Sequence, residues 1–90
     1  MQGKLIDARL IGLSIKALRL ANHLTQEELA NRVGYSVRNL RRIENDGTVN
    51  IDTVNYFAEI FDVSALDILN GCFLFLLISI FDRNVMYSIC

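Results

Sequence analysis

Three arginines, Arg38, Arg41 and Arg42, are spaced so that they could act together on an anionic ligand. If the segment is helical, they share one face with Asn45, which follows one turn further on. A guanidinium group can donate two hydrogen bonds to the O6 and N7 atoms of guanine, and it can equally bind a phosphate. The pattern therefore indicates a contact with nucleic acid. A charged helix face that only meets solvent is the alternative.

The secondary structure predicted around these arginines favours DNA contact. Thr25 and Glu28 have the spacing of a capping box, which begins a short helix. Gly34 suits the left-handed turn that ends such a helix, and Ser36 suits the N-cap of the next one. This second helix would end at the turn residues 45–47. Two helices joined by a turn of this length form a unit that places its second helix in the DNA major groove.

Within this unit, the start of the second helix should lie nearest the bases. Val37 and Arg38 are therefore the first candidates for base contact, with Arg42 one turn behind them. Gln26 stands at the free N–H groups that begin the first helix, where it could bind a phosphate or brace a neighbouring side chain. Of the three arginines, Arg41 is the weakest candidate, because we expect it to point towards solvent.

The apolar spacing predicts further helices around this unit, over residues 6–22 and 51–61. A fifth helix should follow the N-cap Ser64 and stop at Asn70-Gly71. There is no proline in the chain. We therefore predict an all-α fold of five helices, with residues 1–70 forming one DNA-binding domain.

The net charge of −1 hides an asymmetry along the chain. Residues 1–50 carry eight Lys and Arg against five Asp and Glu, whereas residues 51–90 carry one Arg against five acidic residues. A local basic surface, rather than the overall charge, is what attracts phosphate. The first half should therefore carry the DNA-binding surface.

Residues 71–90 differ in kind from the rest and form an apolar C-terminal tail. The run from Cys72 to Phe81 is apolar on both faces, so its periodicity does not separate a strand from a helix. We prefer a β-hairpin, turning near residues 82–84. The run is shorter than the ~20 residues of a membrane-spanning helix, so we expect no membrane partner. It could pack on its own chain, pair with a second copy, or be an altered end; we favour a homodimer.

Taken together, these residues resemble the Cro/C1-type (lambda-repressor-like, XRE) helix-turn-helix family over about residues 9–70. The matching residues are Ile15-Lys16, Leu18-Arg19, Leu24-Thr25-Gln26-Glu27-Glu28-Leu29-Ala30, Val33-Gly34, Ile43-Glu44-Asn45 and Val63-Ser64. The resemblance implies that Gln26 binds at the DNA backbone and supports base readout, and that Asn45 approaches a phosphate. It also implies a structural ion pair between Arg19 and Glu44. The positions that it turns towards the major groove are Ser36, Val37, Arg38 and Arg42.

The chain departs from the family pattern at two places. The loop of residues 46–50 lacks the usual proline and positive charge, although Thr48 could still contact a phosphate. Tyr35 replaces a smaller turn residue, and it could reach a phosphate or simply pack. The complete set of expected DNA-binding residues is Gln26, Tyr35, Ser36, Val37, Arg38, Asn39, Arg42, Asn45 and Thr48.

The expected function is that of a cytoplasmic, dimeric transcriptional regulator, most simply a repressor on a palindromic operator. An antitoxin that also binds a toxin is one alternative, and a protein-interaction module that has lost DNA binding is another. No arrangement of residues suggests an enzyme, a cofactor or a metal site. The two cysteines, Cys72 and Cys90, have neither metal-ligand nor disulfide-framework spacing and should be reduced thiols.

Overall fold

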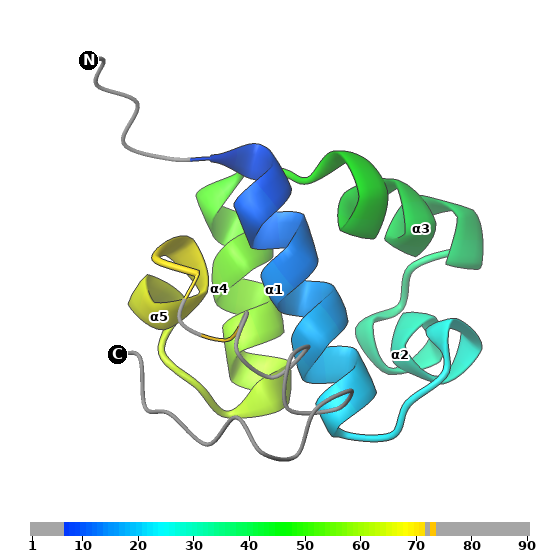
Figure 1. Ribbon diagram of the computed structural model, residues 1–90. Coiled ribbons are helices and arrows are strands. Elements are labelled where there is room, and N and C mark those ends of the chain that lie inside the picture. Colours follow the sequence, from blue (N-terminus) through cyan, green and yellow to red (C-terminus); the bar gives the residue numbers. More distant parts are fainter. Residues whose placement is uncertain (1–6, 72, 74–90) are drawn as a thin grey trace, which may run out of the picture.

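Helices and short connections make up the part of the chain that this computed structural model describes, which is residues 7–71 and 73. In chain order the helices are α1 (Ala8–Ala21), α2 (Gln26–Val33), α3 (Val37–Asp46), α4 (Ile51–Phe61) and α5 (Ala65–Leu69) (Figure 1). This confirms the all-α fold class, and each helix begins and ends within two residues of its expected position. The hairpin expected in the tail and both cysteines lie outside the described residues.

Each helix begins where a short polar side chain can accept hydrogen bonds from free backbone N–H groups. Asp7, Ser36, Asn50 and Ser64 cap α1, α3, α4 and α5, respectively. At α2 the expected capping box is present. The Thr25 hydroxyl accepts from the Glu28 backbone N–H at 3.0 Å, and the Glu28 carboxylate accepts from the Thr25 backbone N–H at 2.8 Å.

The hydrophobic core lies between α1 and α4, with α2 and α3 on one side and α5 on the other (Figure 1). Helix α1 contacts α3, α4 and α5, so it organises most of the molecule. The apolar residues that recur at helical spacing in the sequence face this core. The fully buried large side chains are Phe57, Ile11, Ile15, Leu29, Leu40, Ile68 and Val54. Phe73 also packs against the core cluster.

Helix α3 approaches α1 closely because two glycines leave room for it. A Cβ atom on Gly12, in the middle of α1, would lie 2.5 Å from the backbone oxygen of Ile43 in α3. At the end of α3, Gly47 has a φ of +84°, and a Cβ atom there would overlap the backbone carbonyl of Ala8. Backbone therefore packs directly against backbone, which fixes the position of α3 on the body of the molecule.

Candidate nucleic-acid interface

The turn between α2 and α3 is stabilised by the backbone conformation of Gly34 and by the aromatic packing of Tyr35. Gly34 has the expected left-handed conformation, with a φ of +75°. The ring of Tyr35 packs edge-on against Phe57, with the centroids 5.9 Å apart, and lies 6.2 Å from the ring of Tyr56. The hydroxyl of Tyr56 in turn donates to the backbone oxygen of Val33 at 3.0 Å. Of the two roles open to Tyr35, the structure shows packing.

The faces of α3 separate as the sequence pattern predicts. Leu40, Ile43 and Glu44 are buried, whereas the cluster of Arg38, Arg41, Arg42 and Asn45 is exposed; we call this cluster the basic face. Within the described residues, the one ion pair joins Arg19 to Glu44, so no carboxylate neutralises the arginines of the basic face. Their positive charge is therefore available to an anionic ligand.

Arg42 is held in place from within its own helix. Its Nη2 atom donates to Oδ1 of Asn39 at 2.7 Å. The backbone N–H of Asn39 donates to the Ser36 hydroxyl at 3.0 Å, which is the N-cap bond of α3. Ser36 and Asn39 thus shape the start of α3 and orient Arg42.

The expected ion pair between α1 and α3 is present and buried. Nε of Arg19 donates to Oε2 of Glu44 at 2.7 Å, and Nη2 donates to Oε1 at 3.2 Å. The two side chains are 9% and 1% exposed. The third guanidinium nitrogen, Nη1, donates to the backbone oxygen of Leu24 at 3.0 Å, so each of the three nitrogens donates a hydrogen bond. This pair is structural, as the family resemblance implied.

Gln26 braces neighbouring side chains, which is one of the two roles left open to it. Its Nε2 atom donates to Oε1 of Glu44 at 3.2 Å, and its Oε1 atom accepts from Nε of Arg41 at 3.0 Å. Arg41 is exposed, as expected, and in addition its side chain is tied to the start of α2. No sequence spacing signals a bond between residues fifteen positions apart.

The remaining predicted contact residues are Val37, Thr48 and Asn45, and the first two make contacts within the protein. Val37 is half-buried and packs against the core, which turns part of its surface away from any ligand. The Thr48 hydroxyl accepts from the backbone N–H of Asn50 at 3.1 Å and so shapes the loop before α4. Asn45 is exposed at the far end of the basic face. Their proposed DNA contacts remain predictions.

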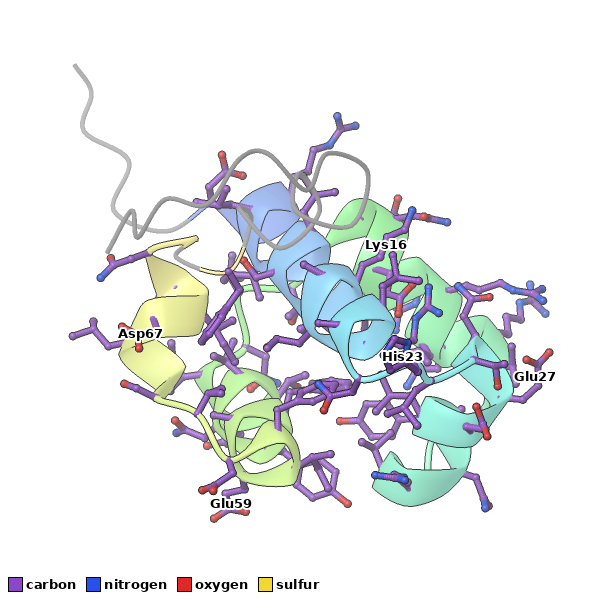
Figure 2. The ribbon with its side chains drawn as sticks, turned by 60° about the horizontal axis from the view of Figure 1, so that its bottom comes forward. Lys16, His23, Glu27, Glu59 and Asp67 are labelled. Carbon is purple, nitrogen blue, oxygen red and sulfur yellow. The ribbon has the colours of Figure 1, made fainter. Side chains whose placement is uncertain are left out.

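Two acidic side chains of α4 and α5 lie on the far side of the molecule from the start of α2 (Figure 2). In Figure 2, Glu59 on α4 and Asp67 on α5 lie far from Glu27, which marks the start of α2. In the part of the chain that is described, no three His, Cys, Asp or Glu side chains are grouped to hold a metal ion. Nor is any helix of that part long and apolar enough for a membrane crossing.

The fold and the basic face together define a helix-turn-helix DNA-binding module, in which α2 packs behind an exposed α3. A family model described as helix-turn-helix matches residues 15–68, from the middle of α1 to α5. The chain belongs to this Cro/C1-type, XRE-like family, which is one of DNA-binding regulators rather than of enzymes. A comparison with curated proteins finds no match.

Proposed function

We propose that this protein is a sequence-specific transcriptional repressor that acts in the cytoplasm as a dimer on a palindromic operator. The observation that carries the proposal is the basic face of α3, whose arginines are exposed and free of carboxylate partners among the described residues. Helix α3 would enter the major groove and exclude other proteins from the site. Family membership supports DNA binding itself.

Within this proposal the start of α3 reads bases, and the flanking residues hold phosphates. Arg38 and Arg42 are the proposed base contacts, since both are exposed along α3 and Arg42 is held by Asn39. The proposed backbone contacts come from residues at the edges of the unit, where they would fix its register on DNA. These are Gln26, Tyr35, Asn45 and Thr48, whereas Ser36 is proposed to face the major groove.

The proposed dimer uses residues 72–90 of the apolar tail. Two subunits joined there would present two copies of α3 to half-sites about one helical turn apart. The apolar composition of this segment supports pairing, because a second copy would remove its side chains from water. The described residues end at Phe73, which packs against the core.

The test is selection of binding sites from a pool of random duplex DNA, at two salt concentrations, with wild type and an Arg38→Ala/Arg42→Ala variant. Each lost bidentate contact should cost about 1–3 kcal/mol, and binding should weaken as salt rises. An Arg9→Ala/Arg32→Ala variant removes the same charge from exposed positions outside the basic face and should keep the site. Absence of an enriched palindrome, with all three proteins alike, would contradict the proposal.

A further inference from the structure

Four side chains form a continuous chain of hydrogen bonds from the interior to the surface. Arg19 and Glu44 are buried, Gln26 is half-buried, and Arg41 is exposed. The links are Nε of Arg19 to Oε2 of Glu44 at 2.7 Å, Nε2 of Gln26 to Oε1 of Glu44 at 3.2 Å, and Nε of Arg41 to Oε1 of Gln26 at 3.0 Å. The outermost member is thus connected to the buried ion pair of Arg19 and Glu44.

The direction of these bonds leaves Gln26 only one orientation. An ionised carboxylate only accepts hydrogen bonds, so Glu44 requires the amide NH2 group of Gln26. A guanidinium group only donates, so Arg41 requires the amide oxygen. Rotating the amide by 180° would set oxygen against carboxylate and NH2 against guanidinium. Gln26 therefore joins an anion to a cation, and the buried ion pair determines where Arg41 is held.

The bond to Gln26 uses one of the five N–H groups of Arg41. The Arg41 side chain is exposed, so its Nη1 and Nη2 atoms can still donate to a ligand. Among the described residues, no carboxylate forms an ion pair with this guanidinium group. The tether holds Arg41 beside the start of α2, whereas Arg42 is tied to Asn39 within α3. In a helix-turn-helix unit, the first helix crosses the sugar–phosphate backbone while the second lies in the groove. Arg41 is thus displaced from the bases towards the backbone.

We propose that Arg41 binds a DNA phosphate and that Gln26 is its positioning residue, oriented by the buried Arg19–Glu44 pair. The inference rests on the proposed function and adds a backbone contact that the sequence pattern ranks last. It makes two claims that would not hold if Arg41 contacted a base. The contact contributes equally on any DNA sequence, and its value depends on Gln26.

The test is a double-mutant cycle of Gln26→Met and Arg41→Ala, measured on two duplexes across a salt series. One duplex carries the site selected by wild type, and the other has mixed sequence without it. Arg41→Ala should weaken binding about tenfold on both duplexes and reduce the salt slope by about 1. In the Gln26→Met background the same substitution should cost less than about threefold, because the tether is already lost.

Two further variants separate positioning from charge and folding. Arg32→Ala removes an equal charge from the far end of α2 and should change affinity less than about twofold on either duplex. Arg41→Lys keeps the charge but not the guanidinium geometry, so the salt slope should stay while coupling to Gln26 falls. Thermal unfolding followed by circular dichroism should show helical content and midpoint close to wild type for each variant.

Additive effects of Gln26→Met and Arg41→Ala would overturn the positioning role. An effect of Arg41→Ala confined to the selected duplex would overturn the phosphate contact and make Arg41 a base-reading residue. Both results leave the proposed function standing. If wild type binds neither duplex more tightly than the Arg38→Ala/Arg42→Ala variant does, the proposed function and this inference fail together.

Discussion

At the scale of single residues, the buried pair of Arg19 and Glu44 links folding to the interface. Glu44→Ala would leave the Arg19 guanidinium buried without its counter-charge, and we expect a loss of about 3–5 kcal/mol in the free energy of unfolding. Urea denaturation measures this loss. A change below about 1 kcal/mol would mean that water or another group replaces the carboxylate.

Replacing both members of the pair should separate stability from binding. Arg19→Met/Glu44→Met removes both buried charges, so much of the stability lost in Glu44→Ala should return. Gln26 then has no carboxylate to orient it, and DNA affinity should stay below that of wild type even though the fold is restored. Denaturation and duplex binding measured on the same preparations would show this. Full recovery of affinity would contradict the role assigned to the pair.

At the scale of the element, the placement of α3 depends on its close packing against α1. Gly12→Ala adds a methyl group 2.5 Å from the Ile43 oxygen, and this contact is with backbone, so the helices must separate. We expect a loss of about 1–3 kcal/mol and weaker DNA binding. The matched control is Gly34→Ala, where no atom lies within 4 Å of the added carbon and only the strain of the φ of +75° remains. If Gly12→Ala and Gly34→Ala weakened DNA binding by the same factor for each kcal/mol of stability lost, a special role for α1–α3 packing would be contradicted.

The start of α2 should respond to pH through Glu28. The bond from the Thr25 backbone N–H lowers the pKa of Glu28 below its ordinary value of 4.5, with smaller contributions from the Thr25 side chain and Arg32. Because the pKa of Glu28 is lower in the folded than in the unfolded protein, its carboxylate stabilises the fold at pH values above the unfolded pKa. This stabilisation is lost as pH falls through the folded pKa. Glu28→Gln keeps an acceptor oxygen but does not titrate. Urea denaturation should therefore show that the free energy of unfolding of wild type exceeds that of Glu28→Gln by less and less as pH falls below about 4.5. A constant difference between the two free energies across that range would contradict this prediction.

At the scale of the whole molecule, charge is divided unevenly: α2 and α3 carry both arginines and acidic residues, whereas α4 and α5 carry acidic residues alone. The basic face lies on α3, while Glu59 and Asp67 lie on the opposite side (Figure 2). Although the whole chain carries a net charge of −1, this division should orient it towards DNA with the basic face leading. The same division leaves the α4 and α5 side unattractive to a second duplex.

The proposed dimer predicts how a shortened chain behaves. Deleting residues 74–90 keeps every described residue, so the helical core should remain folded, but the mass in sedimentation equilibrium should fall from twice the 10.2 kDa chain mass to nearly that of one chain. Binding to a duplex with two half-sites should weaken at least about a hundredfold, because the second contact is no longer intramolecular. Binding to a single half-site should not change. A shortened chain that remains dimeric would place the interface elsewhere.

Features that depend on neighbours along the chain could be predicted from the amino-acid sequence. Caps act over three residues, as in Thr25 and Glu28, and the left-handed turn at Gly34 needs only the absence of a side chain. Helical spacing likewise separated the buried Leu40 and Ile43 from the basic face. The pairing of Arg19 with Glu44 was predictable through family resemblance, although they lie 25 residues apart.

The hydrogen bonds between side chains of the interface could not be predicted from the sequence, because they depend on how the helices pack. The bond between Gln26 and Arg41 exists because α2 packs against α3, whereas Gly12 and Gly47 set how closely α3 approaches α1. The half-burial of Val37 has the same origin, because its surroundings come from the core rather than from its neighbours in sequence. Hydrogen bonds and packing act over a few ångströms in space, so their partners are fixed only once the helices have been brought together.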